Sequence, residues 1–246
     1  MQRVGNSAMP PYSAIGYMAM RWSTNQQWAY GSGSLIDAHH ILTCAHNLVD
    51  ADTDPPPHGY ADRIFFYPGY NQARTTDPPA GGSLVSNAFY PSRFKKGEDA
   101  WDVGICRLAI PFAPPQNFFY FVPVVTGEEI IEEFVNLTGY PGPRRGEMYT
   151  DRDQVNGVHL STNTIIYTHD TWPGNSGSPT WTLETIPEDV TRQHAIHVSR
   201  QAQNLRRGLL ITNEIYQWIQ GAIRMPFSAD GGITEVKVAD QAAAAS

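Results

Sequence analysis

The sequence has little cysteine, little charge and no long apolar run. Its 246 residues include two cysteines and 17% charged side chains, with a net charge of −7. Two cysteines make no disulfide framework, and no stretch approaches the roughly 20 apolar residues of a membrane span. A negative net charge also disfavours nucleic acid and anionic membranes as partners. We therefore expect no nucleic-acid partner and no membrane partner.

The sequence leaves open the cellular compartment and whether the two cysteines form a disulfide. No charged and then apolar signal peptide opens the chain. We expect a secreted protein whose signal is missing from this chain, with the cytoplasm as the alternative, and we expect a monomer. Cys44 and Cys106 lie in apolar stretches, which favours buried free thiols over a single bridge between them.

What the sequence does contain is a series of short apolar or alternating runs separated by turn residues. Glycine (21) and proline (19) are plentiful, and 41% of the residues are hydrophobic. This spacing predicts an all-β fold. One helix is expected, over 213–223, with Ile215, Trp218, Ile219, Ala222 and Ile223 on one face. The expected strands are 14–22, 28–36, 64–67, 83–90, 103–108, 130–139, 157–161, 164–168, 179–183, 194–199 and 208–211.

A connector rich in proline and aromatic residues divides the chain into two lobes. We expect an N-terminal lobe over 1–112, the connector over 113–123, and a C-terminal lobe with the helix over 124–224. The remaining residues, 225–246, would form a tail containing one possible strand in ITEVKV.

Three motifs carry the residues of a nucleophilic triad. His46 lies in LTCAHN, Asp102 in WDVGIC and Ser176 in PGNSGSP. A serine hydroxyl needs a histidine to accept its proton, and that histidine needs an acid to fix its tautomer. Asp99 competes for the role of the acid. We prefer Asp102, because it opens an apolar run that would carry it inward beside His46.

The glycines around the serine point to a second part of the same chemistry. In GNSGSP they permit a tight turn that exposes the hydroxyl of Ser176. Such a turn aims the backbone N–H groups of Gly174 and Ser176 at one point, where they would form an oxyanion hole. Because His46 and Asp102 precede the connector and Ser176 follows it, we expect the site in the cleft between the lobes.

Five stretches together resemble a known family. RVGNSAMPPYSAIGYM, ILTCAHN, WDVGIC, LTGYPGP and HDTWPGNSGSP followed by AIHV are similar to bacterial glutamyl endopeptidases, which are chymotrypsin-fold serine proteases. The resemblance implies two antiparallel six-stranded β-barrels followed by a C-terminal helix. It also implies an endopeptidase that works through an acyl-enzyme on a protein or peptide substrate. No cofactor and no metal are expected, and His194 and His197 lack further partners for zinc.

The resemblance also implies a specificity pocket. The family's preference for cleavage after Glu is attributed to positions that hold Thr171 and His197 here. Both side chains can donate to a carboxylate, and a protonated His197 would add charge. Arg200 stands where the family usually has glycine, and it would either pair with an acidic side chain or crowd the substrate.

Asp170 supports a competing interpretation. It lies six residues before Ser176, where trypsin-type enzymes place the acid that binds Lys or Arg. A carboxylate at the base of the pocket would repel a glutamate side chain. Two alternatives therefore remain open: a trypsin-like protease that cuts after Lys or Arg, and an inactive protein of protease fold that binds peptides.

Overall fold

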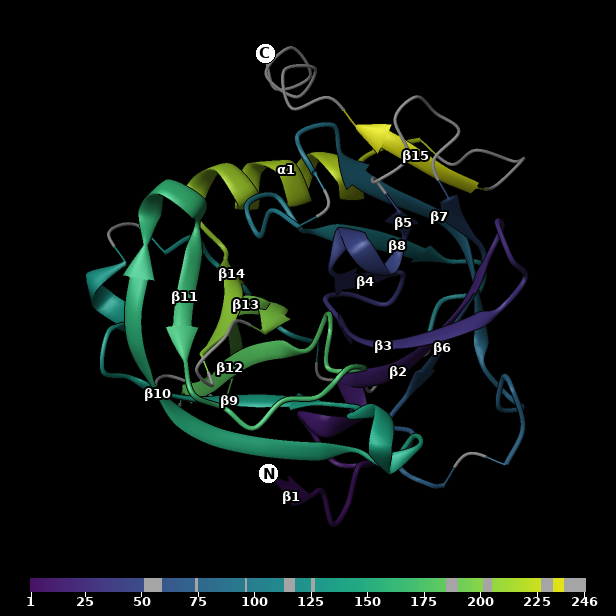
Figure 1. Ribbon diagram of the computed structural model, residues 1–246, viewed down its shortest axis with the longest axis horizontal. Helices are drawn as coiled ribbons and strands as arrows, with labels where there is room; N and C mark the ends of the chain where they lie inside the picture. Colours follow the sequence, from purple (N-terminus) through teal and green to yellow (C-terminus); the bar gives the residue numbers. More distant parts are fainter. Residues whose placement is uncertain are drawn as a thin grey trace.

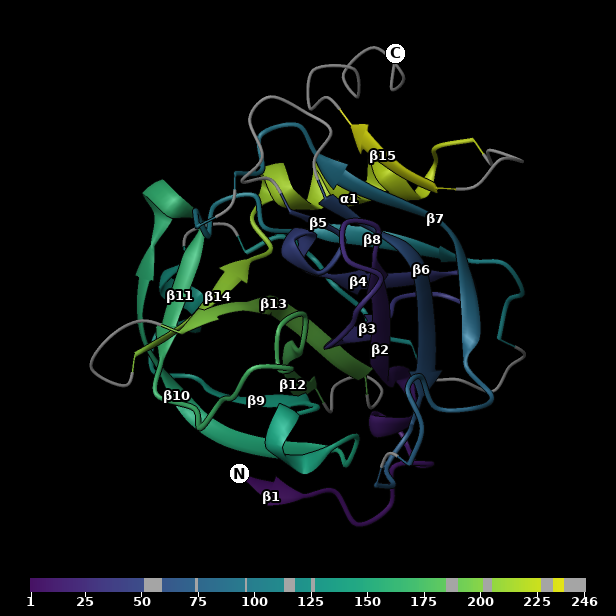
Figure 2. The same ribbon diagram turned by 45° about the vertical axis from the view of Figure 1, so that its right-hand side comes forward.

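The structure is a computed structural model, and it describes residues 1–50, 59–73, 75–95, 97–112, 118–124, 127–184, 190–200, 205–226 and 232–236. Its strands form two sheets, and each sheet closes on itself through one additional pairing. Figures 1 and 2 show the two resulting barrels side by side, with the N-terminal strand β1 (Gln2–Arg3) and the helix α1 (Asn213–Ile223) at opposite ends.

The first barrel is built from the N-terminal half of the chain. Its six strands follow the order β7-β8-β4-β3-β2-β6, and β6 pairs with β7 to close it. β5 extends the sheet beyond β6, and β15 adds a parallel strand beside β7. The strands are β2 (Ile15–Trp22), β3 (Trp28–Leu35), β4 (His40–Thr43), β5 (Val49–Asp50), β6 (Gly59–Pro68), β7 (Ser83–Pro91), β8 (Gly104–Leu108) and β15 (Gly232–Val236).

The second barrel follows the order β10-β11-β14-β13-β12-β9, and β9 pairs with β10 to close it. β1 attaches to the outside of β10. The strands are β9 (Phe134–Gly139), β10 (Tyr149–His159), β11 (Thr164–Tyr167), β12 (Pro179–Glu184), β13 (Val190–Arg200) and β14 (Arg206–Leu210). Short 3₁₀ turns lie between strands of both barrels: η1 (Tyr12–Ala14), η2 (Ala45–Asn47), η3 (Glu128–Ile130), η4 (Gly142–Arg144) and η5 (Leu160–Thr162).

The two closed six-stranded barrels and the helix confirm the predicted fold class, with the parallel pair β15–β7 as the exception to antiparallel pairing. The prediction failed most clearly at β10, where only 157–161 was expected. Its first residues, YTDRDQVN, alternate too weakly in hydrophobicity to indicate a strand. Residues 113–117 of the predicted connector, and most of the predicted tail, lie outside the described residues.

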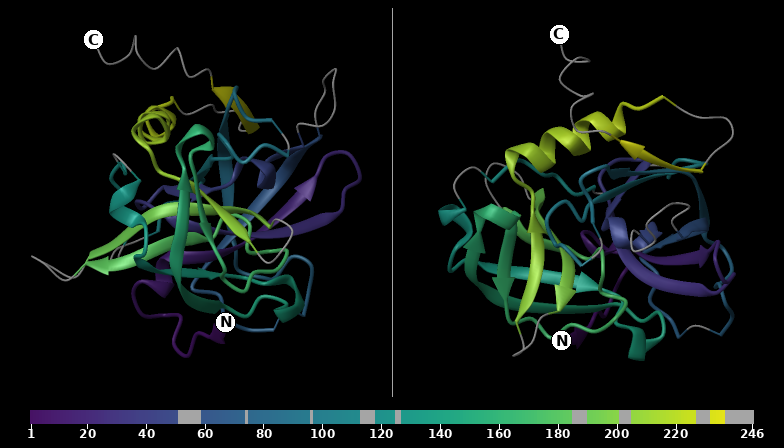
Figure 3. Two further views of the ribbon diagram at one scale, coloured as in Figure 1. Left: turned by 60° about the vertical axis from the view of Figure 1, so that its left-hand side comes forward. Right: turned by 45° about the horizontal axis from the view of Figure 1, so that its top comes forward.

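Helix α1 packs on a core that both barrels share. Its N-cap, Thr212, accepts a hydrogen bond from the N–H of Ile215, and Glu214 lies in the first turn. The buried face meets residues of β8 from the first barrel and of β13 from the second. Figure 3 shows α1 beside β15 at this end of the molecule. The helix therefore joins the barrels through apolar contact.

Two further expectations from the sequence concern the cysteines and membrane-spanning segments. Cys44 and Cys106 are both buried and unpaired, as predicted. Among the described residues, no helix combines the length and the apolar character that crossing a bilayer would require.

The shared core can be tested at Ile219, which is fully buried in it. We expect Ile219→Ala to lower the free energy of unfolding by about 2–5 kcal/mol, because it leaves a cavity in the shared core. Gln217→Ala, on the exposed face of the same helix, should change it by less than about 0.5 kcal/mol. Urea denaturation of both variants measures the difference. Equal effects would contradict the packing described here.

Candidate active site

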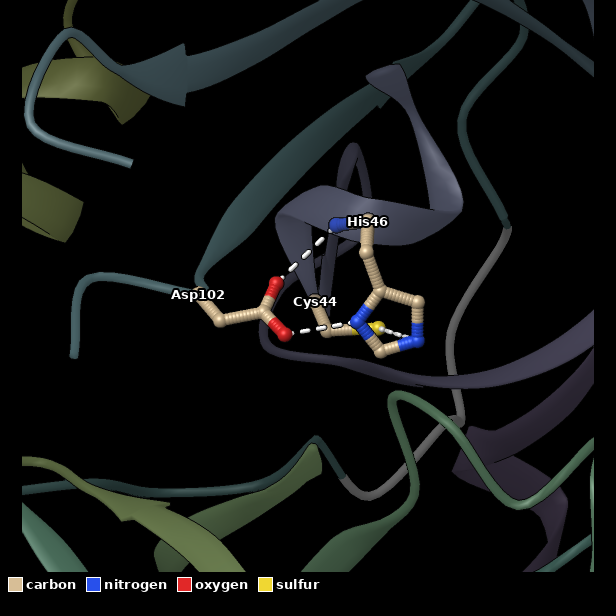
Figure 4. A group of neighbouring side chains, drawn as sticks. All are labelled: Cys44, His46 and Asp102. Carbon is tan, nitrogen blue, oxygen red and sulfur yellow. Dashed lines mark hydrogen bonds and ion pairs between the residues drawn. The ribbon is translucent and has the colours of Figure 1, made fainter. Parts of the chain in front are cut away.

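His46 and Asp102 meet at the edge of the first barrel. His46 lies in η2, directly after β4, and Asp102 lies two residues before β8. Because β4 and β8 are neighbours in the sheet, the two residues come together. Asp102 Oδ2 lies 2.6 Å from His46 Nδ1, and Asp102 Oδ1 accepts a hydrogen bond of 2.9 Å from the His46 backbone N–H (Figure 4). Two bonds from one carboxylate fix both the ring and its backbone.

The thiol of Cys44 supports the same ring. Its sulfur lies 3.5 Å from His46 Nε2, and in Figure 4 it sits behind the ring, against the face of the imidazole. Ligand atoms of Cys44, His46 and Asp102 lie within 4.8 Å of one another. However, two ligands of one zinc ion stay about 3 Å apart or more, whereas Nδ1 and Oδ2 are 2.6 Å apart and bonded directly. The arrangement is that of a hydrogen-bonded pair.

The electrostatics of this pair favour a basic imidazole. Burial lowers the pKa of His46, but the charge of Asp102 and its hydrogen bond act against burial. The net effect raises the pKa of His46 well above its ordinary value near 6.5. Burial also raises the pKa of the Cys44 thiol, which therefore stays protonated and neutral under the ring.

The turn that carries Ser176 is tied to the first barrel by its own backbone carbonyl. The oxygen of Ser176 accepts a hydrogen bond of 2.8 Å from the N–H of Ser32, on β3, and one of 3.0 Å from Nδ2 of Asn47. Asn47 directly follows His46 and also donates to Oγ1 of Thr43, at 3.0 Å. The Ser32 hydroxyl donates to the carbonyl of Gly174, at 2.8 Å. These bonds bring the turn of Ser176 next to the loop of His46.

Close backbone approach explains both glycines in the motif. Gly177 has φ +85°, and a Cβ there would lie 2.1 Å from the carbonyl oxygen of Ser32. At Gly174, φ is +101° and a Cβ would lie 2.4 Å from the oxygen of Tyr140. Both positions therefore need glycine for conformation and for space.

The hydroxyl of Ser176 and two backbone N–H groups of its turn are available to bind a ligand. Within the described part of the chain, neither the N–H of Gly174 nor that of Ser176 has a hydrogen-bond acceptor. In the same residues no hydrogen bond joins the Ser176 hydroxyl to His46. Two free N–H groups beside an uncommitted hydroxyl could stabilise a negatively charged oxygen.

Asp99 has a different partner from Asp102. Its carboxylate accepts a hydrogen bond of 3.0 Å from Arg207, on β14 of the second barrel. Its backbone oxygen accepts a bond of 3.3 Å from the N–H of Asp102. The ion pair thus ties the turn of Asp102 to the opposite barrel, and among the described residues no hydrogen bond or ion pair joins Asp99 to His46.

The residues predicted for the specificity pocket divide into two groups. Thr171 and His197 are buried. The side chain of Asp170 is 58% exposed, and its Oδ2 lies 3.9 Å from the Met1 amine. Arg200 ends β13. The backbone of His197 bonds to the turn of Ser176, because its oxygen accepts from the N–H of Gly177 at 2.9 Å.

The imidazole of His197 has a pKa far below its ordinary value, so it is neutral at neutral pH. Burial is the main cause that lowers its pKa, to about 3, and the nearby charges of His169, His46 and Arg206 add to this. Its Nδ1 lies 2.8 Å from the hydroxyl of Tyr167. His197 can therefore offer a hydrogen bond to a ligand but no positive charge.

A cavity of about 450 Å³ opens beside His46 and Asp102. Apolar side chains from both barrels line it together with the pair (Trp22, Val49, Phe94 and Val198), and so do the charged residues Asp50, Glu98, Asp99 and Arg207. Thr171 and His197 are not among its lining residues. Its size suits one or two side chains of a peptide.

Sequence reasoning missed several residues that build the site, among them Ser32, Asn47 and Arg207. Each acts across the boundary between the barrels, so no local pattern indicates it. Asn47 gave the one usable sign, since it stands directly beside a predicted triad residue.

Comparison with known proteins identifies the family. Residues 31–185 match the trypsin-like peptidase domain. No curated protein is significantly similar in sequence. Among solved structures, a Glu endopeptidase is 19% identical with a TM-score of 0.71, covering 89% of this chain and 94% of that one. HL collagenase is 14% identical (TM-score 0.67; 92% and 98% covered). The inactivated scabies mite protease paralogue S-I1 is 15% identical (TM-score 0.62; 86% and 94% covered). At these identities the likeness shows the fold alone.

Gly177→Ala tests the close approach of the two barrels. We expect it to lower the free energy of unfolding by about 2–5 kcal/mol, from the strained φ and from the clash with Ser32. Gly81→Ala is the matched control, since Gly81 has φ +83° but open space around it, and we expect about 1–2 kcal/mol there. Thermal or urea unfolding measures both. Equal losses would mean that the turn is not held against Ser32.

Proposed function

Because the chain belongs to the trypsin-like peptidase domain family, we propose that it is a serine endopeptidase that cleaves after glutamate. The observation that carries the catalytic part is the geometry around His46. Asp102 holds its ring and backbone, and Asn47, the next residue, holds the carbonyl of Ser176. Hydrogen bonds thus connect Asp102 directly to His46, and connect the residue after His46 to the carbonyl of Ser176.

In the proposed mechanism Ser176 is the nucleophile. His46 Nε2 accepts the hydroxyl proton while Oγ attacks the scissile carbonyl, and Asp102 stabilises the imidazolium that forms. The N–H groups of Gly174 and Ser176 bind the oxyanion. His46 then donates the proton to the leaving amine, which leaves an acyl-enzyme on Ser176. Water, activated by His46, releases the acyl product and restores the serine.

Two observations support glutamate at the cleaved position. The Thr171 hydroxyl is buried and has no partner among the described residues, so a substrate oxygen would satisfy it. His197 offers a neutral imidazole next to the turn of Ser176. Conversely, Asp170 is exposed and bonded through its N–H to Asp151. This disfavours a trypsin-like pocket, in which Asp170 would have to face inward.

A fluorophosphonate probe tests the catalytic part. We expect it to label the wild-type protein on Ser176, and we expect no labelling of Ser176→Ala, because only an activated serine reacts. Ser178→Ala is the control, since this neighbouring hydroxyl is buried. Mass spectrometry of the intact protein and of its peptides locates the adduct. If the wild type stays unlabelled, the catalytic proposal fails, and the alternative that remains is an inactive protein of protease fold that binds peptides.

A cleavage-site profile on a mixed peptide library, with Ser176→Ala as background, tests the specificity. Cuts clustered after Glu would support the proposal. Cuts after Lys or Arg that disappear in Asp170→Asn would instead assign the pocket to Asp170.

The pH dependence follows from His46. As general base it must be neutral, so kcat/KM should fall as pH drops through its pKa, which is raised well above 6.5. Asp102→Asn removes the charge that raises this pKa, so the acid limb should move to lower pH. We also expect kcat to fall about 10⁴-fold, because the imidazole loses its fixed tautomer. Stopped assays from pH 5 to 9 measure both effects, and an acid limb that stays in place would argue against the pair.

A further inference from the structure

The first proposed oxyanion donor, the N–H of Gly174, is aimed by the peptide to which it belongs. A trans peptide is planar and its N–H points away from its carbonyl, so a bond to the carbonyl fixes the direction of the N–H. Here the carbonyl is that of Pro173, and it accepts a hydrogen bond of 2.6 Å from the N–H of Gly142, in η4. A Cβ at Gly142 would lie only 2.8 Å from the same oxygen. The close approach of η4 therefore sets the direction of the first donor.

The second proposed donor, the N–H of Ser176, is aimed in the same way. Its peptide carries the carbonyl of Asn175, which accepts a hydrogen bond of 2.9 Å from the N–H of Ser178. The N–H of Asn175 donates to the carbonyl of Trp172, at 3.0 Å, and the side-chain Oδ1 of Asn175 accepts from the N–H of Trp172, also at 3.0 Å. Bonds within the turn thus hold the second donor.

The peptide between the two donors is held by a side chain from the other barrel. Its carbonyl, that of Gly174, accepts a hydrogen bond of 2.8 Å from the hydroxyl of Ser32, on β3. Gly174 has φ +101°, and a glycine backbone rotates more freely than that of any other residue. Without the bond from Ser32, the peptide between Gly174 and Asn175 would be free to rotate, and the angle between the two donors would change.

The hydroxyl of Ser32 is itself fixed. Ser32 is fully buried, and its Oγ accepts a hydrogen bond of 3.1 Å from the N–H of Tyr140, which leaves its single proton for the carbonyl of Gly174. Both backbone groups of Ser32 are also bonded. Its N–H donates to the carbonyl of Ser176, at 2.8 Å, and its carbonyl accepts from the hydroxyl of Thr43, at 2.9 Å. The hydroxyl therefore approaches the turn from a rigid support.

We propose that Ser32 is a positioning residue for the oxyanion hole. Its hydroxyl holds the carbonyl of Gly174 and so keeps the N–H groups of Gly174 and Ser176 converged on one point before a substrate binds. Donors that are already in place need not turn during the reaction, and a small misplacement of such groups costs up to about 100-fold in rate. The inference rests on the catalytic part of the proposed function and is independent of the preference for glutamate.

Ser32→Ala removes the hydroxyl and keeps the backbone bond to Ser176. On a peptide that the wild type cleaves, we expect kcat to fall about 10- to 100-fold with KM unchanged within about threefold, because the donors act on the oxyanion of the transition state. Ser34→Ala is the matched control. Ser34 lies two residues further along β3, is fully buried, and donates through its hydroxyl to Oε1 of Gln193, at 2.7 Å. Both variants lose one buried hydrogen bond, so urea denaturation should show similar losses, but Ser34→Ala should keep kcat within about threefold.

A peptidyl trifluoromethyl ketone gives a spectroscopic measure of the same effect. Oγ of Ser176 adds to the ketone carbon, the hydroxyl proton passes to His46, and the former carbonyl oxygen becomes the oxyanion. Fluorine NMR of this adduct follows the protonation of the oxyanion as pH is lowered. In Ser32→Ala we expect protonation at a pH higher by about one to two units, which corresponds to the same 10- to 100-fold loss. Ser34→Ala should titrate like the wild type.

Wild-type kcat in Ser32→Ala would overturn the inference while leaving the hydrolase in place. An equal loss of kcat in Ser34→Ala would also overturn it, because any lost hydrogen bond of β3 would then suffice. If Ser32→Ala does not fold, Ser32→Cys takes its place, since a thiol is a weaker donor. We expect kcat about 3- to 10-fold lower there, and an unchanged kcat would count against the role of Ser32. If the wild type neither cleaves peptides nor reacts with the fluorophosphonate, the proposed hydrolase itself fails, and this role fails with it.

Discussion

The carbonyl oxygen of Ser176 is the point on which the arrangement of the cleft depends. It accepts bonds from Ser32 in the first barrel and from Asn47 beside His46. Because these donors are buried and directional, the turn of the serine cannot slide relative to the histidine without leaving polar groups unpaired. The glycine at 177 is what allows such an approach. The same hydrogen bonds therefore fix the Ser176 turn of the second barrel relative to the His46 loop of the first.

Charge is distributed around this point in an ordered way. Asp102 is committed to His46, and Asp99 is committed to Arg207 on the opposite barrel. Asp102 and Asp99 therefore each have their own partner, an imidazole and a guanidinium. His197 stays neutral because burial, and after it the nearby charges of His169, His46 and Arg206, lower its pKa. Further from His46, Nδ1 of the buried His169 lies 3.4 Å from Oδ2 of Asp151, whose Oδ1 lies 3.1 Å from the Met1 amine.

The sequence alone predicted the parts of the fold that depend on local patterns. The helix was placed at 213–223 with its buried face correct, because four of its residues repeat at helical spacing and are fully buried. The barrels followed from the resemblance, and β10 was largely missed because its polar residues give no alternation. His46 and Asp102 were found as motif residues. Ser32, Asn47 and Arg207 were not, because their roles arise only when two barrels distant in sequence come together.

The shared core beneath α1 has a consequence for how the protein folds during its synthesis. Leu42 and Ile105 from the first barrel, and Ile196 and Leu209 from the second, belong to the same hydrophobic cluster as the buried face of α1. Domains fold as units while synthesis proceeds from the N-terminus. During translation, then, this shared core would be complete only once residues 213–223 have left the ribosome. A nascent chain shorter than this would carry the motifs of His46, Asp102 and Ser176 without the helix whose apolar face packs in the core shared by the two barrels.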